Sequence, residues 1–548
     1  MQQCGGDAAL AKSMHLRACA AGAIEDASVL LDYHDCLLFL LAYPESATLH
    51  RAASRELERV AVAARQMLER GKARERAKLA NTGVAWAPMT IAFGYDVVRW
   101  LAREHAGHAE IDSFDAAGAS LPELLRLTLP PLESELLAGE DMEPAEFLAD
   151  ASAGRRGSQL GWLVDEIERL PSAEAIRERL FDALKAYVAI KPGATSLSRT
   201  FVRGLRGQVF HHRGPLQRTV DPGMILDQPL APPRRLDRGR AAHLLDSGRA
   251  MLASLGRETD ALAAAAPEGV EYHELGRGTS IALYTMRPER RLALDSHVGF
   301  MLFKNAVPVA YGGGWPFFAT CKIGVNIFAP YRGAESSLLF CQVLRVYRQR
   351  FGIAHFVAEP SQFGAGNREG LESGAFWFYY RLGFRPVDAP IAVLAAHEYA
   401  KIRDDRTYRA PLPVLRRFTR SDLELRLRDA PATAPCDPAE LSRAVTAWIA
   451  GRFHGDRGAA MKYAWRRATN ALGMHDSENW PDAPRAAMLA LCPLFAMIPD
   501  LAEWPERDKA RLIALVRAKG GNEYRFFALL RSHARFESAL RALTAAAD

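Results

Sequence analysis

The stretch "APYRGAESSLLFCQVLRVYRQRFG", residues 329–352, joins a short turn containing proline and glycine to a long amphipathic run. Residues 323–328 just before it predict a strand that Pro330 ends, because proline cannot donate to a sheet ladder. From Leu338 onward, apolar residues recur at three- and four-residue intervals, which predicts a helix packed on a sheet. A strand, a glycine turn and a helix in this order direct free backbone N–H groups toward one spot that suits a pyrophosphate.

Whether this stretch indicates a pyrophosphate site depends on the sequence around it, because an ordinary helix start with a serine cap has the same local sequence. Four runs rich in β-branched and aromatic residues precede it, at 279–286, 297–305, 307–313 and 321–328, and predict a meander of antiparallel strands. Residues 312–314, three glycines, are interpreted as a bulge joining two of these strands. A strand at 355–360, an aromatic helix at 371–383 and a strand at 384–387 follow.

The whole chain of 548 residues is too long for one core and should divide into several domains. Helical periodicity before and after the predicted strands gives an α+β chain with a mixed sheet in its centre and all-helical flanks. The expected divisions are an all-helical N-terminal domain at 1–198, an Arg/Pro-rich linker at 199–240, a central sheet domain at 241–405 and an all-helical C-terminal domain at 406–548.

Composition excludes several classes of protein. Hydrophobic residues make up 49% and charged residues 24%, and no apolar stretch reaches the length of a membrane span. The N-terminal residues lack the apolar core of a signal peptide, so we expect a cytoplasmic protein with no membrane association. The seven cysteines are odd in number and never spaced as Cys-x-x-Cys, which argues against disulfides and a zinc site.

The positive charge is concentrated in one segment. The net charge is +6, and residues 199–240 alone contain nine arginines against three aspartates. Such a segment suits phosphate, nucleic acid or an acidic domain, although a solvated connector is the commoner case.

A second motif, "FWFYYRLGFRPV" at residues 376–387, changes the interpretation of the turn. Together with "APYRG" and the order of strands, it resembles the GNAT superfamily, the Gcn5-related N-acetyltransferases. Tyr379, Gly383 and Phe384 match that family's Tyr-x-x-x-Gly-Phe, and the resemblance covers about residues 270–390. It implies a GNAT-like central domain whose turn holds the pyrophosphate of acetyl-CoA or another acyl-CoA.

The match departs from the family at two places. Glu335 stands where the family usually has a second glycine, and a carboxylate beside a diphosphate is unfavourable unless it points away or pairs. Glu372 stands where an asparagine commonly contacts the pantetheine arm, while Asn367 lies five residues earlier. The resemblance implies these cofactor-binding residues: Ile327, Phe328, Arg332, Gly333, Ala334, Glu335, Ser336, Ser337 and Asn367.

Acyl transfer from a thioester to an amine needs an oxyanion donor, an acid for the leaving thiolate and a base for the amine. The resemblance implies that the backbone of Ile327 and Phe328 supplies the donor and that Tyr379 is the acid. Glu359, at the end of the strand at 355–360, is the first candidate for the base, and His297 and Asp295 are second choices. Tyr379 could instead simply pack in its aromatic cluster, and Glu359 could cap a loop.

The leading hypothesis is therefore an N-acyltransferase that acts on a small-molecule or peptide amine. Its acyl donor would be acyl-CoA, or a thioester on an acyl-carrier protein or an aminoacyl-tRNA that binds the basic linker at 199–240. The alternative is a non-catalytic GNAT-like module that mediates interactions with protein or nucleic acid, which the carboxylate of Glu335 favours. We expect no metal.

Overall fold

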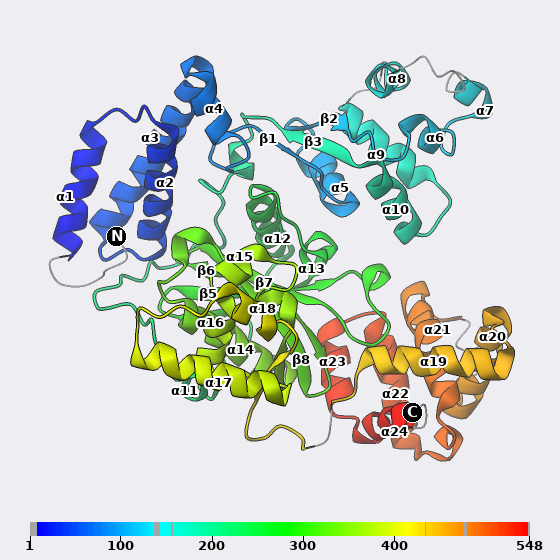
Figure 1. The fold of residues 1–548 in the computed structure, drawn as a ribbon. Helices are drawn as coiled ribbons and strands as arrows, with labels where there is room; N and C mark the ends of the chain where they lie inside the picture. The colour runs from blue at the N-terminus through cyan, green and yellow to red at the C-terminus, as the bar shows by residue number, and fades with distance from the viewer. Residues whose placement is uncertain (1–7, 136–142, 155–156, 433–434, 475–478, 546–548) are drawn as a thin grey trace.

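The computed structural model describes residues 8–135, 143–154, 157–432, 435–474 and 479–545. Figure 1 shows four parts along the chain: helices at the N-terminus, a small sheet with helices, a large central sheet, and a helical bundle at the C-terminus. The protein is therefore a mixed chain of helices and strands, as the sequence predicts.

The N-terminal helices pack through apolar faces. Helix α3 begins where Ser46 accepts the N–H of Leu49 (3.2 Å) and ends before Gly71. Its buried residues recur every three or four positions and face its neighbours. The helices are α1 (Ala8–Ala21), α2 (Ala27–Ala42), α3 (Ala47–Arg70) and α4 (Ala73–Leu79).

A three-stranded antiparallel sheet follows within the region expected to be all-helical up to residue 198, which corrects that expectation. Strand β3 (Ala186–Ile190) lies between β1 (Met89–Ile91) and β2 (Ala109–Phe114). These strands are short and far apart in the chain, so helical periodicity dominates any sequence window around them. The accompanying helices are α5 (Tyr95–Glu104), α6 (Leu121–Leu125), α7 (Pro131–Ser134), α8 (Pro144–Ala151), α9 (Gln159–Arg169) and α10 (Glu174–Leu184).

The expected linker at 199–240 is extended over most of its length. It follows the turn η2 (Thr195–Leu197) and contains one short helix, α11 (Pro222–Leu226). Helix α12 (Arg238–Ala253) begins inside its last residues, where the carboxylate of Asp237 accepts the N–H of Arg240 (2.8 Å). The linker therefore connects the small sheet to the central one.

The central sheet has eight strands in the order β10-β11-β9-β8-β7-β6-β5-β4. Neighbouring strands are antiparallel except β8 and β9, which run parallel and need the crossover helix α14 (Ser336–Phe351) between them. The strands are β4 (Ala265–Gly276), β5 (Thr279–Met286), β6 (Val298–Lys304), β7 (Val307–Phe317), β8 (Thr320–Ile327), β9 (His355–Ala358), β10 (Arg385–Pro386) and β11 (Leu423–Arg426).

Helices cover both faces of this sheet. A Cβ added to Gly314 would meet Tyr347 of α14, whereas one added to Gly299, the register partner of Gly313, would meet Ala261. Successive residues of a strand point to opposite faces, so α14 and α13 (Asp260–Ala263) lie on opposite faces. We call the face that α13 covers the glycine face. The other elements are α15 (Arg368–Glu372), α16 (Ala375–Arg381), α17 (Ala389–Asp404), α18 (Leu412–Phe418), η3 (Pro288–Arg290), η4 (Ala329–Tyr331) and η5 (Pro360–Gln362).

Two expectations about the strands are wrong, and one strand, β4, is absent from the sequence prediction. The glycines at 312–314 lie inside β7, not in a bulge between two strands. Strand β4 forms the edge of the sheet but has a mixed pattern of exposure that shows no clear alternation. Strand β11 belongs to the sheet although it lies in the region 406–548 expected to be all-helical. It has only four residues, and pairing with β9 decides its conformation.

The C-terminal part is a helical bundle, with α22 and α23 joined by a short turn through Gly520 and Gly521. Asp437 caps α19 by accepting the N–H of Ala439 (2.8 Å), as its Asp-Pro start predicts. The elements are α19 (Pro438–Phe453), α20 (Arg457–Leu472), α21 (Asp482–Met497), η7 (Leu501–Glu503), α22 (Glu506–Lys519), α23 (Glu523–Arg531) and α24 (Ala534–Ala545).

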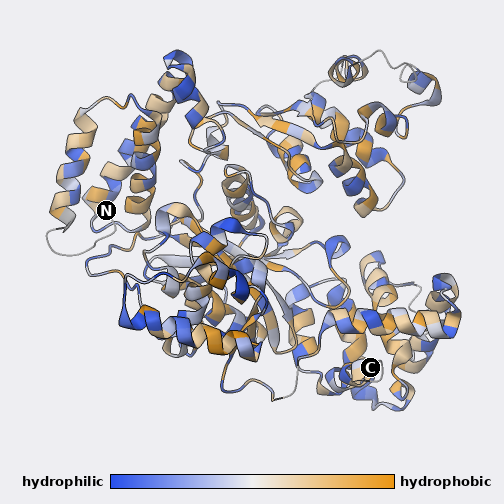
Figure 2. Ribbon diagram, in the orientation of Figure 1, coloured by the Kyte–Doolittle hydropathy of each residue, from blue (hydrophilic) through white to orange (hydrophobic). Residues whose placement is uncertain are grey.

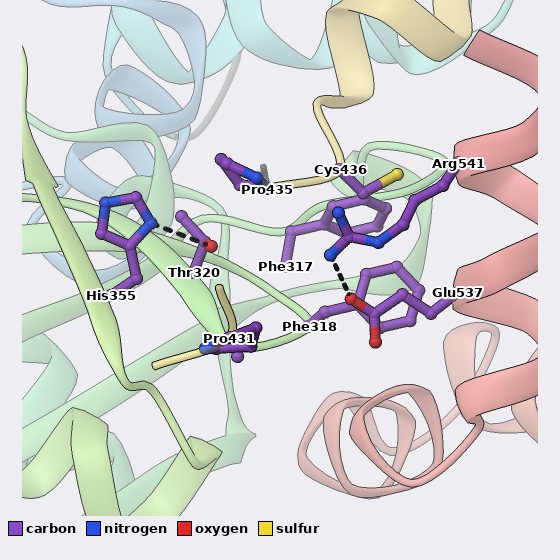
Figure 3. Close-up of a pocket in the computed structure, with 10 residues that line it drawn as sticks. Phe317, Phe318, Thr320, His355, Pro431, Pro435, Cys436, Glu537 and Arg541 are labelled. Carbon is purple, nitrogen blue, oxygen red and sulfur yellow. Dashed lines mark hydrogen bonds and ion pairs between the residues drawn. The ribbon is translucent and has the colours of Figure 1, made fainter. Parts of the chain in front are cut away.

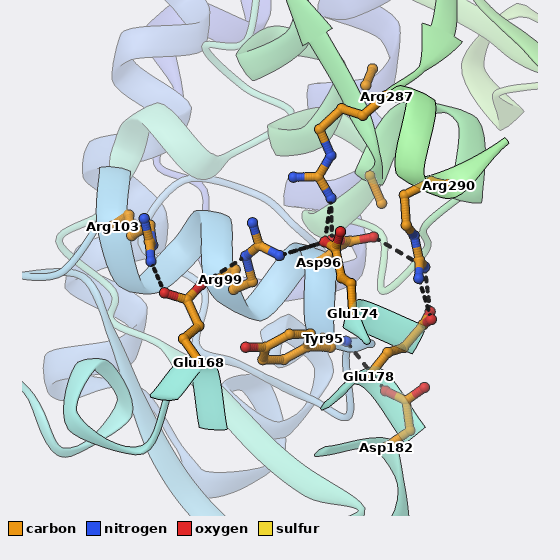
Figure 4. Close-up of polar contacts among 12 residues, drawn as sticks. Tyr95, Asp96, Arg99, Arg103, Glu168, Glu174, Glu178, Asp182, Arg287 and Arg290 are labelled. Carbon is orange, nitrogen blue, oxygen red and sulfur yellow. Dashed lines mark hydrogen bonds and ion pairs between the residues drawn. The ribbon is translucent and has the colours of Figure 1, made fainter. Parts of the chain in front are cut away.

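Charged side chains join the small sheet unit to the central sheet (Figure 4). Arg287 bonds to Glu174 (2.7 Å) and to Asp96 (3.1 Å), and Arg290 lies 3.3 Å from Asp96. Arg290 also pairs with Glu178 of α10. Because these side chains are mostly buried and share partners, they form one connected network across the junction.

The helices carry both hydrophobic and hydrophilic residues along their lengths (Figure 2). Among the residues described, none of the helices has the length and apolar content that crossing a membrane requires.

Candidate functional site

Strands β8 and β9 pair only at their beginnings and then part. Three residues at the start of each strand are register partners, the last pair being Lys322 and Val357. Strand β8 continues alongside β7 as far as Ile327, whereas β9 ends at Ala358. In the described part of the chain, the edge of β8 beyond Lys322 therefore faces no neighbouring strand.

Pairing with β7 decides which amides of β8 face this open edge. The N–H of Phe328 donates to the carbonyl of Val309 (3.0 Å), and hydrogen-bonded residues alternate along an antiparallel ladder. The N–H groups of Val325 and Ile327 therefore point away from β7, toward the side that β9 has left. The N–H of Ile327 thus faces the open edge, whereas the N–H of Phe328 is taken by the carbonyl of Val309.

The turn after β8 bends through Gly333, whose φ of 77° suits glycine. The side chain of Arg332 donates to the carbonyl of Ile327 (3.0 Å) and pairs with Glu369 of α15 (2.5 Å). The N–H of Gly333 lies 3.3 Å from the hydroxyl of Ser336. Arg332 therefore lies across the open edge of β8 and links it to α15.

The amides at the start of α14 differ in their availability. The N–H of Ala334 donates to the carbonyl of Tyr331 (3.2 Å), so it is engaged within the turn. Among the described residues, no acceptor bonds to the N–H groups of Ser336 and Ser337, and no side chain caps the helix. The first turn of α14 therefore presents free donors and the positive end of the helix dipole.

Glu335 points away from these amides. Its carboxylate is fully buried and bonds to Lys304 (2.8 Å), Arg277 (2.9 Å) and the N–H of Gln217 (3.0 Å). Burial raises the pKa of Glu335, but Lys304 and the other donors outweigh burial and lower it overall. The expected repulsion between Glu335 and a diphosphate is therefore absent, because the carboxylate is neutralised on the far side of the turn.

Tyr379 lies in α16 with only 2% of its surface exposed. Its ring packs against Phe340 of α14 (5.5 Å between centroids) and against Phe384 (5.5 Å). Burial raises the pKa of Tyr379, while the nearby N–H of Val325 lowers it by a smaller amount. No described residue makes a hydrogen bond of normal geometry to this hydroxyl. The phenol is therefore buried and protonated, with its oxygen near the open edge of β8.

Glu359 follows β9 and lies on the glycine face. Its carboxylate is 2.9 Å from Lys322 and about half exposed. The register of β9 and β11 places Asp422 opposite Glu359, one step beyond the pair of Ala358 and Leu423. Burial and then the charge of Glu359 raise the pKa of Asp422, whereas Lys322 lowers it. Two carboxylates and an ammonium group thus meet where β8 and β9 part.

His297 lies on the same face, one strand beyond Trp315. Its imidazole stacks on the Trp315 ring with centroids 4.1 Å apart and an angle of 8° between planes. Burial lowers the pKa of His297 to about 4, and Asp260 raises it slightly. Trp315 is the register partner of Lys322, which binds Glu359, so the two candidate bases belong to one row of side chains. Asp295, the other second choice, has a pKa raised by burial.

Glycines form the floor beneath this row. Gly299, Gly313 and Gly324 are register partners across β6, β7 and β8. A Cβ on Gly313 would lie 2.1 Å from the imidazole of His297, and one on Gly324 would lie 2.1 Å from the amide of Gln362. Both side chains therefore come directly against the sheet, with Nε2 of His297 nearest Gly313, which only glycine beneath them permits.

Sequence reasoning missed Gln362 and Asp422. Gln362 lies in η5 over the point where β8 and β9 part, and Asp422 reaches the site only through the pairing of β11. Neither has a local motif that could have revealed it. Asn367 was expected to contact the cofactor, but its side chain caps α15 by accepting the N–H of Gly370 (2.9 Å). Glu372 pairs with Arg368 (2.7 Å) at the surface.

Two cavities lie elsewhere. One, of about 10 Å³, is at the start of β8, where Thr320 and His355 face Cys436 and Arg541 of the C-terminal part (Figure 3). That volume holds roughly one water molecule, so it is no substrate pocket. The other, of about 660 Å³, is an open hollow lined by Trp465 and residues of α21. No group of side chains within the described residues has the composition of a metal site.

Comparison with known proteins yields no match to a family model, to a curated protein or to a solved structure. The geometry of the chain's own residues therefore carries the functional argument.

Proposed function

We propose that this protein is an N-acyltransferase that moves an acyl group from a coenzyme A thioester, or from a carrier-bound one, to an amine. The observation that carries the proposal is the parting of β8 and β9 after Lys322 and Val357. It leaves the N–H groups of Val325 and Ile327 facing an unpaired edge, beside the open start of α14. An extended thioester arm could lie along such an edge as a strand would, with its phosphates at the helix start.

The proposed chemistry uses groups on both sides of the opening. The amine nitrogen attacks the thioester carbonyl carbon, the carbon–nitrogen bond forms and the carbon–sulfur bond breaks. The N–H of Ile327 stabilises the oxyanion, and the phenol of Tyr379 gives its proton to the departing thiolate. Burial raises the pKa of Tyr379, so the phenol is protonated at neutral pH but is a weaker acid than an exposed tyrosine; the nearby N–H of Val325 partly offsets this shift.

The proton of the amine would pass to the glycine face. Glu359 is the first candidate for the base, and its neighbour Asp422 has a raised pKa that makes it a stronger acceptor. His297 is neutral at pH 7 because its pKa is about 4, so it can accept a proton but holds it weakly. The acceptor amine would therefore approach from the face opposite α14.

Binding of coenzyme A, measured by calorimetry, tests this proposal. We expect measurable binding to the native protein and a loss of roughly tenfold or more in Arg332→Glu, because the substitution puts a carboxylate beside the phosphates. Arg381→Glu is the matched control, since Arg381 is an exposed arginine of the neighbouring helix α16. Absence of binding at millimolar coenzyme A, or equal loss in both variants, would overturn the proposal.

The alternative of a non-catalytic interaction module has one observation in its favour. The amide of Gln362 rests on Gly324 where the strands part, and Tyr379 is buried with its ring edge-to-face against Phe340. A thioester arm would have to displace such packed side chains to enter. A Gln362→Ala variant that still fails to bind coenzyme A would favour the module.

A further inference from the structure

Residues 203–218, which we call the basic strap, run along the end of the central sheet where β8 ends and α14 begins. Near its start, the N–H of Gly204 donates to the carbonyl of Ala306, between β6 and β7 (2.8 Å). Near its end, the N–H of Gln217 donates to Glu335 (3.0 Å). The strap is therefore fixed to the hairpin of β6 and β7 on one side and to the start of α14 on the other.

The first residue of the strap, Arg203, is half-buried, and its guanidinium donates to the carbonyl of Val202 (2.7 Å). The end of the strap lies beside the turn between β8 and α14, because Gln217 is bonded to Glu335. This placement explains Glu335: the carboxylate that departs from the family pattern is the anchor of the strap.

The outer surface of the strap is uniformly positive. Residues 203–218 contain four arginines and no acidic residue. Arg206, Arg213 and Arg218 are exposed, and Arg206 and Arg213 make no ion pair with any residue that the structure describes. The exposed arginines therefore give the strap a positive surface, and the strap is bonded to the start of α14 through Gln217.

Two aromatic side chains of the strap, Phe210 and His212, pack against other parts of the protein, whereas His211 is half-exposed. His212 is 1% exposed and its ring lies near Tyr43, the residue after α2 (5.0 Å between centroids), and near Phe210 (4.8 Å). The guanidinium of Arg277 lies over the ring of Phe210 (5.4 Å to the centroid). These rings are thus engaged inside the protein, whereas single-stranded RNA is bound by aromatic rings that are open to its bases. Positive charge without such rings favours an acidic protein surface over RNA.

We infer that the basic strap docks an acidic carrier protein whose phosphopantetheine arm presents the acyl thioester at the opening between β8 and β9. The inference rests on the proposed function and specifies the acyl donor as a carrier protein. Coenzyme A and a carrier protein share the arm, so the opening would accept both. Only the carrier has an acidic surface large enough to meet Arg206 and Arg213 while its arm is inserted.

The test compares three probes on the full-length protein: free 4′-phosphopantetheine, a purified holo-acyl-carrier protein of bacterial fatty-acid synthesis, and the same carrier without its arm. We expect the holo-carrier to bind more tightly than the free arm. We expect Arg206→Glu/Arg213→Glu to weaken holo-carrier binding by about tenfold or more and binding of the free arm by about twofold at most. The matched control is Arg235→Glu/Arg240→Glu, which reverses two exposed arginines elsewhere in the linker.

The possible outcomes separate the inference from the proposed function. If free phosphopantetheine binds but the holo-carrier binds no tighter, or if both double variants behave alike, the strap inference is wrong while the proposed function stands. If tRNA binds through the same arginines and the carrier does not, the strap is an RNA site and the inference is again wrong. If neither the arm nor coenzyme A binds at millimolar concentration, the proposed function itself fails.

Discussion

Glu335 shows how one buried carboxylate can determine the geometry around it. It lies at the start of α14, yet its side chain bonds to Lys304, Arg277 and the backbone of Gln217, and both Glu335 and Lys304 are fully buried. A buried charge without its partner is strongly unfavourable, so these groups depend on one another. The pair joins β6, the basic strap and α14 at a single point.

Removal of the carboxylate should therefore destabilise the fold. We expect Glu335→Ala to lower the free energy of unfolding by about 3–5 kcal/mol, because it leaves Lys304 buried and unpaired. The double variant Lys304→Met/Glu335→Leu should lose much less, since it removes both charges. Chemical denaturation measures both values, and equal losses in the two variants would show that the pair is not coupled.

The pKa of Glu335 gives this prediction a pH dependence. Its folded pKa is lowered below the ordinary value of 4.5, so its contribution to stability is fully present above that value. The contribution is lost as the pH falls through the folded pKa. The stability difference between native protein and Glu335→Ala should therefore shrink in acid and remain constant near neutral pH.

At the scale of elements, the row of glycines across β6, β7 and β8 determines what can lie on the glycine face. Two polar side chains, His297 and Gln362, contact the sheet where any larger residue would exclude them. Burial lowers the pKa of His297 to about 4 and so keeps its imidazole neutral at pH 7, stacked on Trp315. The glycines therefore control both the position and the proton affinity of a candidate base.

Gly313→Ala tests this control. The new Cβ would lie 2.1 Å from the imidazole, so the ring must leave its place on the sheet. Exposure to water should raise the pKa of His297 from about 4 toward its ordinary value of 6.5. An NMR titration of the imidazole protons measures the shift, with Gly207→Ala, a change at an open linker position, as control. An unchanged pKa in Gly313→Ala would disprove the proposed packing.

At the scale of the whole molecule, the four parts are joined by buried polar contacts as well as apolar ones. The network around Asp96 and Arg290 joins the small sheet unit to the central sheet (Figure 4). A second junction lies before His297, where Lys519 of α22 donates to the carbonyl of Asp295 (3.2 Å) and pairs with Glu523 (3.0 Å). The helical parts thus contact the segment that leads into β6, next to the candidate site.

Sequence reasoning succeeded where a feature is local. The turn at Arg332 and Gly333, the start of α14 and the strands from β5 to β9 follow from period, capping and turn residues. It failed where residues far apart in the sequence determine the structure. Partners elsewhere in the chain determine the pairing of β11, the position of Asp422 and the hydrogen bond from Phe328 to Val309. The direction of the Glu335 side chain depends on Lys304 and Arg277, which no local pattern connects to it.

Hydrogen–deuterium exchange of residues 323–338, with and without coenzyme A, tests the central claim most directly. The amides of Ile327, Ser336 and Ser337 should exchange quickly in the unliganded protein and slowly when the pantetheine arm and phosphates of coenzyme A occupy the opening. We predict protection confined to this segment and its neighbours in α15 and η5. Unchanged exchange at saturating coenzyme A, or protection only in the helical parts, would contradict the account.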